Sequence, residues 1–151
     1  MSRFLAYHGT TADFSAFDPA KTVGGGLHFG SKEQARMRGG QKARLIAVEL
    51  SVERPRRSRD MGGNWASKIR SAKSAGHDAI VYLNRYEGIP LQRVLDAHRD
   101  GIDLDRLSDR AFRQRIPEAQ DSWIVFDAEK VRILPAQTDA PPPALRPKRR
   151  T

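Results

Sequence analysis

The sequence predicts a single domain of the α+β class, and three observations lead to this prediction. Short apolar segments typical of strands are separated by helix-prone segments of unequal length, so regular βαβ alternation is missing. The 151 residues suffice for one domain with a hydrophobic core and are too few for two ordinary domains. Hydrophobic residues make up 38% of the chain and charged residues 30%, as is usual for globular proteins.

The first two expected strands lie next to glycines. Residues 4–8 have the aromatic and apolar content of a short strand that ends at Gly9, and residues 27–29 form a second strand entered through the glycines at 24–26. Because glycine has no side chain, we expect a ligand to approach the backbone closely at this second strand. His8 and His28 therefore belong to short strands beside glycines, where functional side chains are often found.

The middle of the chain predicts two helices and two more strands. Ser31 is a suitable N-cap for the first helix, which Gly39 and Gly40 end. Met37, near the end of that helix, is expected to face the core. The expected elements are a helix over residues 32–38, a strand over 43–52 that Pro55 ends, a helix capped by Asn64 and stopped by Gly76, and a strand over 79–83.

The C-terminal part predicts a helical lobe, a last strand and a tail. Residues 89–115 are polar and helix-prone with two apolar stripes, which indicates an inserted helical lobe. Residues 123–126 form the last strong strand, and residues 131–134 add a short edge strand. The prolines at 141–143 and the basic residues that follow cannot supply a packed core. We therefore expect a domain over residues 1–135 and a disordered basic tail over residues 136–151.

Charge and cysteine content limit the possible functions. The net charge of +9 and the pI near 10.5 favour acidic partners, including nucleic acid, acidic proteins and nucleotide phosphates. The chain has no cysteine, which removes thiol nucleophiles and thiolate zinc sites, and we expect no metal. It also shows no signal-peptide pattern and no run of about 20 apolar residues, so we expect a cytoplasmic protein without a membrane partner.

Three short motifs, in order, resemble those of one enzyme superfamily. They are Tyr-His-Gly-Thr at residues 7–10, Leu-His-Phe-Gly-Ser at 27–31 after a Gly-rich approach, and Asp-Ser-Trp-Ile-Val-Phe-Asp at 121–127. This order resembles the ADP-ribosyltransferase superfamily in its diphtheria-toxin and poly(ADP-ribose) polymerase branch, over roughly residues 4–134. The resemblance implies a split β-sheet core with flanking helices and a helical insertion. It also implies NAD as co-substrate and transfer of ADP-ribose to a macromolecular acceptor, either protein or nucleic acid. The basic surface suggests that this acceptor is acidic.

The resemblance also implies roles for single residues. His8 would hydrogen-bond a ribose hydroxyl of NAD, the backbone of Gly9 would hold the nicotinamide amide, and Thr10 would support the adenosine side. His28 stands where the family usually has a tyrosine, and it adds a titrating group at that position. Further expected contacts to NAD are Gly26, Phe29, Ser31, Asn84 and Ser122.

The sequence departs from the family pattern at the catalytic carboxylate. The usual glutamate, which stabilises a cation-like transition state, aligns with Ser122, which carries no charge. Asp121 and Glu87 are the candidate replacements. Neighbours on a strand face opposite sides, so Asp121 and Ser122 cannot both point into one cleft without a bulge. We therefore prefer Glu87, and the alternative is a surface carboxylate that pairs with Arg85 or Arg93.

Two other functions stay open on the sequence alone. One is a non-catalytic module that binds NAD or nucleic acid on the same scaffold. The other is a small ribonuclease in which His8 and His28 share the proton transfers. The ADP-ribosyltransferase hypothesis depends on one spatial expectation, that His8 and the strand at His28 face each other across a single groove.

Overall fold

The computed structural model describes residues 2–10, 16–18, 22, 25–40 and 42–135, and its fold is mixed α+β as the sequence predicts. The predicted tail over residues 136–151 lies outside the described residues. The strands are β1 (Ser2–Thr10), β2 (Leu27–Phe29), β3 (Arg44–Val52), β4 (Pro55–Ser58), β5 (Ala79–Leu83), β6 (Asp121–Val125) and β7 (Val131–Ile133). The helices are α1 (Lys32–Gly39), α2 (Trp65–Ser74), α3 (Leu91–Arg99) and α4 (Asp109–Arg115), with 3-10 turns η3 (Leu104–Arg106) and η4 (Ala128–Lys130).

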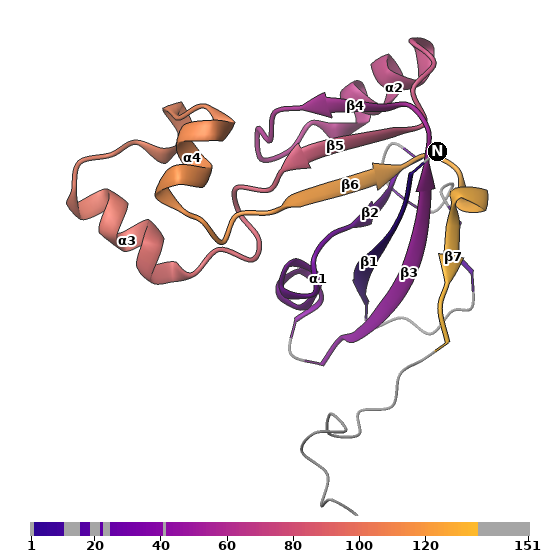
Figure 1. Cartoon of the computed structure of the whole chain (residues 1–151), viewed down its shortest axis with the longest axis horizontal. Helices are drawn as coiled ribbons and strands as arrows, with labels where there is room; N and C mark the ends of the chain where they lie inside the picture. The colour runs from indigo at the N-terminus through magenta and orange to yellow at the C-terminus, as the bar shows by residue number, and fades with distance from the viewer. Residues whose placement is uncertain (1, 11–15, 19–21, 23–24, 41, 136–151) are drawn as a thin grey trace, which may run out of the picture.

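The strands form two sheets that lie side by side (Figure 1). The first sheet is antiparallel with the order β1-β3-β7, and the second has the order β2-β6-β5-β4, in which only β4 runs parallel to its neighbour. The sheets meet where Tyr7 and Gly30 exchange two backbone hydrogen bonds of 2.9 and 3.0 Å. The largest apolar cluster joins both sheets and includes Leu27, Phe29, Val48, Leu50 and Val125.

Two helices cover different parts of this framework. Helix α1 packs so closely on β1 that a Cβ added to Gly9 would lie 2.0 Å from the Ala35 carbonyl oxygen. Helix α2 packs on the second sheet through Ile69, which contacts Ile80 and Ile124. His28 and Ser122 lie on the same face of that sheet as Ile80 and Ile124, because His28 pairs with Ile124 and Ser122 is two residues away on β6.

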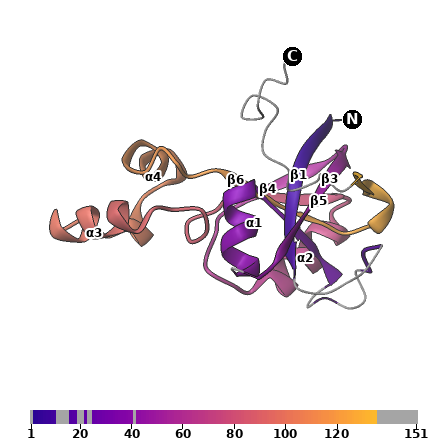
Figure 2. The same ribbon diagram turned by 90° about the horizontal axis from the view of Figure 1, so that it is seen from below.

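The predicted helical lobe is confirmed over α3, η3 and α4, and it projects away from both sheets (Figures 1 and 2). A small apolar cluster forms its core and includes Ile89, Phe112 and Ile116. Arg85, directly after β5, anchors the lobe, because its guanidinium donates to the carbonyls of Leu104 and Leu107 and to Asp109 at 2.7–3.1 Å. The side chain of Arg85 is only 2% exposed.

Several sequence-based expectations are wrong in detail. Residues 55–58 form β4 at the edge of the second sheet, where the missing N–H of Pro55 at the first strand position disturbs no ladder. Strand β1 continues through Gly9 to Thr10. Asn64 occupies the N-cap position of α2 with φ 62°, and its side chain makes no cap hydrogen bond. Met37 is 51% exposed and does not face the core. Within the described ranges, no helix has the length and apolar character needed to span a bilayer.

Candidate functional site

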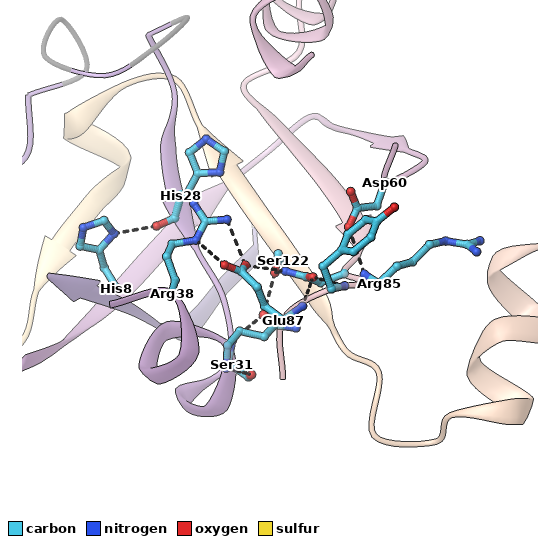
Figure 3. A network of polar contacts seen from close by, with 11 residues as sticks. His8, His28, Ser31, Arg38, Asp60, Arg85, Glu87 and Ser122 are labelled. Atoms are coloured by element: carbon cyan, nitrogen blue, oxygen red, sulfur yellow. Dashed lines mark hydrogen bonds and ion pairs between the residues drawn. The ribbon is translucent and has the colours of Figure 1, made fainter. Parts of the chain in front are cut away.

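A cleft opens where the two sheets meet and where α1 lies close to the loop after β5. The space between its walls is about 240 Å³, which includes the part open to solvent. The side chains leave only about 10 Å³ that a water molecule can enter, roughly room for one water. Polar residues from five elements and one loop reach this cleft, as the close-up in Figure 3 shows for several of them. They include His8, Gly9, His28, Gln34, Arg38, Tyr82, Glu87 and Ser122.

Glu87 is the carboxylate of the cleft. It accepts two hydrogen bonds from Arg38, from Nε at 2.9 Å and from Nη2 at 3.0 Å (Figure 3). The Glu87 side chain is 21% exposed and that of Arg38 is 39% exposed, so the pair lies at the boundary with solvent. Burial lowers the pKa of Arg38, but the hydrogen bonds and the negative charge of Glu87 outweigh burial and raise it overall. Arg38 is therefore a permanent cation in the cleft.

Asn84 links this carboxylate to Ser122 on β6. Its Nδ2 donates to Glu87 Oε1 and to Ser122 Oγ, both at 2.9 Å. Its Oδ1 accepts the backbone N–H groups of Tyr86 and Glu87, which fixes the turn after β5. Ser122 Oγ donates in turn to Gln34 Oε1 at 2.6 Å. The Glu87 carboxylate is thus separated from Ser122 by a single, fully hydrogen-bonded side chain.

His28 lies on the same side of the cleft as Arg38 and Glu87 (Figure 3). Burial, followed by the positive charge of Arg38, lowers its pKa to about 4, and the negative charge of Glu87 only partly opposes this shift. The imidazole is therefore neutral at pH 7. Its Nδ1 atom is buried and has no hydrogen-bond partner among the described residues. A buried polar atom without a partner is uncommon, and it suits a position that a ligand group completes.

His8 and the strand at His28 border one cleft, as expected, but the rings of the two histidines point to different sides of the strand junction. Because Tyr7 pairs with Gly30, His8 lies opposite Phe29 and Gly9 lies opposite His28. The His8 ring accordingly contacts Phe17 and Phe29, at centroid distances of 5.1 and 5.8 Å. Its Nδ1 hydrogen-bonds the His28 carbonyl at 2.8 Å, and burial lowers its pKa. His8 joins the two strands, while His28 faces the carboxylate.

The backbone of Gly9 borders the cleft on the side of His28. In an antiparallel strand, the backbone N–H and C=O of every second residue point to the same neighbouring strand. Tyr7 directs these groups toward β2, and Gly9, two residues later, therefore does the same. In the described structure no hydrogen bond joins Gly9 to His28, because β1 and β2 separate after the Tyr7–Gly30 bridge. Gly9 therefore presents one donor and one acceptor at the edge of the cleft.

Other residues expected to contact NAD have structural contacts instead. Gly26 is required by packing, since a Cβ there would lie 2.5 Å from Ile124 and 2.7 Å from Ile69. Phe29 is 3% exposed and belongs to the core, although its edge reaches the cleft. Ser31 caps α1, with its Oγ accepting the Gln34 N–H at 3.1 Å, and does not line the cleft. The role of Thr10, the last residue of β1, stays a prediction.

Asp121 lies outside the cleft, on the opposite face of β6 from Ser122. It accepts two hydrogen bonds from Arg57, at 2.7 and 3.1 Å, and so it is the wrong candidate for the carboxylate of this cleft. The alternative partners considered for Glu87 are also wrong. Arg85 pairs with Asp109 and Arg93 pairs with Glu118.

Three residues of the cleft were not anticipated from the sequence. Gln34 had a usable signal, because Ser31 and Gln34 form a capping box in which each side chain meets the other's backbone N–H. Tyr82 belongs to the strand predicted over residues 79–83, but a continuous apolar run does not show which face of the strand borders a cleft. Burial raises the pKa of Tyr82 to about 12. Nothing in the sequence marks Arg38, which reaches Glu87 across 49 positions.

In the part of the chain that the structure describes, no group of three or more histidine and carboxylate side chains could hold a metal ion. Comparisons of the chain with protein-family models, with curated proteins and with solved structures found no match. The function of the cleft is therefore inferred from its own geometry and from the three motifs.

Proposed function

We propose that this protein cleaves the bond between nicotinamide and ribose in NAD and transfers the ADP-ribose to a macromolecular acceptor. The observation that carries this proposal is the position of Glu87. Its carboxylate lies in the cleft and is tied through Asn84 to Ser122, the position that resembles the catalytic glutamate of the ADP-ribosyltransferases. A glutamate from a neighbouring loop thus replaces the one missing from the strand.

The chemistry requires a negative charge at that place. As the bond from ribose C1′ to the nicotinamide nitrogen breaks, its electron pair passes to the nicotinamide ring and positive charge develops on the ribose. A carboxylate beside the ribose stabilises that charge, as in glycoside hydrolysis. A lone pair of the acceptor then bonds to C1′, and the acceptor's proton passes to solvent. Glu87 performs the stabilising role.

The rest of the cleft suits the ligand. The open N–H and C=O of Gly9 match a carboxamide, which has one acceptor and a donor of its own, and nicotinamide carries such a group. His28 is neutral, so its ring packs against a positively charged ring without repulsion, and its Nδ1 can accept or donate one hydrogen bond. These contacts give NAD a defined orientation beside Glu87.

NAD does not fit while the Arg38–Glu87 pair closes the cleft, which leaves room for about one water. Opening an exposed ion pair of this kind costs on the order of 1 kcal/mol or less. The freed Arg38 side chain then faces the pyrophosphate of the ligand, for which a guanidinium is well suited. We therefore assign Arg38 the role of a phosphate contact that binds Glu87 until NAD enters.

Of the alternatives, the non-catalytic NAD-binding module would use the same cleft and the same contacts to NAD, and it differs from the transferase only in the lack of turnover. The ribonuclease is disfavoured, because one imidazole must be protonated near neutral pH, whereas burial lowers the pKa of both His8 and His28. Their rings also point to different sides of the strand junction.

The test is nicotinamide release from NAD, followed by mass spectrometry with the full chain. Glu87→Gln keeps the hydrogen bond from Asn84 but removes the charge, and we expect release to fall by about 100-fold or more. Asp121→Asn is the matched control, since it removes a carboxylate of the same sheet that lies outside the cleft, and its rate should stay near that of the parent protein.

Thermal unfolding with and without NAD separates the alternatives. If NAD raises the midpoint but no nicotinamide is released, the protein is a binding module. Equal release by the parent protein and Glu87→Gln would exclude the role proposed for Glu87.

A further inference from the structure

A second hollow, with a free volume of about 480 Å³, opens beside the cleft. Its lining includes Arg38, Met61, Trp65, Tyr82, Tyr86 and Glu87. Three of these, Arg38, Tyr82 and Glu87, also line the cleft, so the two spaces are neighbours. The volume is within the range of about 300–1,000 Å³ that small-molecule sites occupy. A group held in this aromatic hollow lies next to the Glu87 carboxylate.

The walls of the aromatic hollow carry flat ring surfaces. Tyr86 is 52% exposed, so about half of the surface of this large aromatic side chain is open to solvent. The partly buried Trp65 ring packs on the Tyr82 ring at a centroid distance of 4.4 Å, and Tyr82 is only 2% exposed, so Trp65 and Tyr86 supply the ring surface that solvent reaches. Exposed rings of this kind stack on nucleobases, and each such stack contributes about 1–3 kcal/mol.

The chain concentrates its positive charge in the segment that also supplies Met61, Gly62 and Trp65 to this hollow. Residues 54–74, which span β4, the loop that lines the hollow and α2, contain seven basic residues and one acidic residue. This segment therefore supplies six of the nine net positive charges of the chain. The basic residues are Arg54, Arg56, Arg57, Arg59, Lys68, Arg70 and Lys73, and we call them the β4–α2 basic surface. Figure 1 shows β4 at the free edge of its sheet with α2 beside it.

Most of these cations lack a carboxylate of their own. Among the described residues, only Arg57 has a carboxylate oxygen within 4 Å, that of Asp121. Lys68 lies over the Trp65 ring, 4.7 Å from its centroid, and donates to the Arg59 carbonyl. Lys68 thus flanks the aromatic hollow, and neither Lys68 nor Arg59, whose guanidinium donates to the Asp105 carbonyl at 2.5 Å, is paired with a carboxylate among the described residues.

The carboxylates in the hollow do not oppose an anionic ligand strongly. Asp60 is 6% exposed and accepts the backbone N–H groups of Gly62 and Arg85 at 2.9 and 3.0 Å (Figure 3). The Asp60 carboxylate is therefore buried and already hydrogen-bonded to the backbone of two loops. The charge of Glu87 is balanced by Arg38.

We propose that the β4–α2 basic surface and the aromatic hollow bind single-stranded nucleic acid, with phosphates on the cations and one unstacked base in the hollow. Cations alone would serve an acidic protein equally well, but stacking rings add affinity only for a partner with flat bases. A duplex keeps its bases stacked and cannot place one in the hollow without extrusion. That the bound strand is also the acceptor of ADP-ribose rests on the function proposed above.

The test is fluorescence anisotropy with the full chain and no NAD. The probes are a labelled 12-nucleotide single strand of mixed sequence as DNA and as RNA, the matching duplex, and a labelled polyglutamate of equal charge. We expect a single strand to bind most tightly, with an affinity that falls as salt rises from 50 to 300 mM, because bound phosphates release counterions.

Paired variants locate the binding site. Tyr86→Ala should weaken single-strand binding about tenfold, the loss of one stacked base, whereas Leu95→Ala, equally exposed but on the helical lobe, should not. Lys68→Gln should reduce the slope of log K against log salt by about 0.7, and Arg93→Gln on the lobe should leave the slope unchanged.

Each outcome decides the proposal. Equal affinity for polyglutamate, or binding unaffected by both Tyr86→Ala and Lys68→Gln, would overturn it, because the affinity would then come from charge alone or from other cations. If the protein binds the single strand but releases no nicotinamide from NAD, this proposal is supported and the proposed transferase function is excluded. Nicotinamide release without binding to any strand does the reverse.

Discussion

The helical lobe and the β4–α2 basic surface use positive charge in opposite ways. In the lobe, four of the six arginines pair with nearby carboxylates, which are Arg93 with Glu118, Arg99 with Asp96, Arg106 with Asp103 and Arg115 with Asp100. On the β4–α2 basic surface, Arg57 is the only cation that has a carboxylate partner among the described residues, and that partner is Asp121. Charge in the lobe thus contributes mostly to ion pairs within its own part of the chain, whereas most of the charge around α2 has no carboxylate partner, as the proposed nucleic-acid surface requires.

The stability lost with one cation should depend on how deeply that cation is buried. Most of the lobe pairs are exposed, and exposed pairs contribute little each. Arg85 is the exception, because it is buried where the lobe joins the second sheet and its guanidinium lies 4.8 Å from the Phe112 ring centroid. The lobe should therefore depend on Arg85 more than on its surface pairs.

The largest expected effect is the loss of this anchor. Arg85→Met keeps much of the volume but leaves Asp109 and the carbonyls of Leu104 and Leu107 without their donor. We expect the free energy of unfolding in urea to fall by about 3 kcal/mol. Arg93→Met, which breaks an exposed pair, is the control and should cost less than about 1 kcal/mol. Similar losses for the two variants would show that burial does not distinguish these arginines.

A second, smaller effect concerns the cleft between the two regions. His28 has a pKa of about 4 in the folded protein and about 6.5 when unfolded, so the unfolded state binds more protons between these values. The stability that the neutral ring provides is complete above pH 6.5 and is lost as pH falls toward 4. We expect a loss of about 2 kcal/mol between pH 7 and pH 5, measured by urea unfolding at a series of pH values.

His28→Gln removes this titrating group and should flatten most of the pH dependence, and the pKa of His8, which burial also lowers, contributes the remainder in the same direction. An unchanged profile would mean that the low pKa of His28 is not realised in solution.

The smallest effect should differ in sign between the two regions. Arg70→Gln on α2 relieves repulsion among neighbouring cations, so we expect a stability gain of a few tenths of a kcal/mol at low salt. Arg93→Gln on the lobe breaks an ion pair and should lose a similar amount. Both shifts should shrink in 0.5 M salt, where exposed charges are screened. A stability loss in both variants would contradict the difference between the regions.

Local sequence patterns were sufficient for most elements of the fold. The helix after Ser31, the strand over residues 79–83 and the helical lobe follow from caps and apolar spacing, which act within a few residues. Strand β4 was not predicted, because a short basic edge strand is stabilised by its neighbour β5 and not by its own apolar pattern. Gly26 was assigned to ligand approach, whereas its small size serves the packing of Ile69 and Ile124, which the sequence does not place together.

By itself the sequence determined the α+β class, the order of the elements other than β4, and the preference for Glu87 over Asp121, since strand neighbours face opposite sides. Only the tertiary structure decided that Arg38 binds Glu87, that Asn84 ties Glu87 to Ser122, and that the rings of His8 and His28 diverge. The physical reason is one of range. Periodicity and capping depend on near neighbours, whereas an ion pair across 49 positions depends on how the sheets and helices pack.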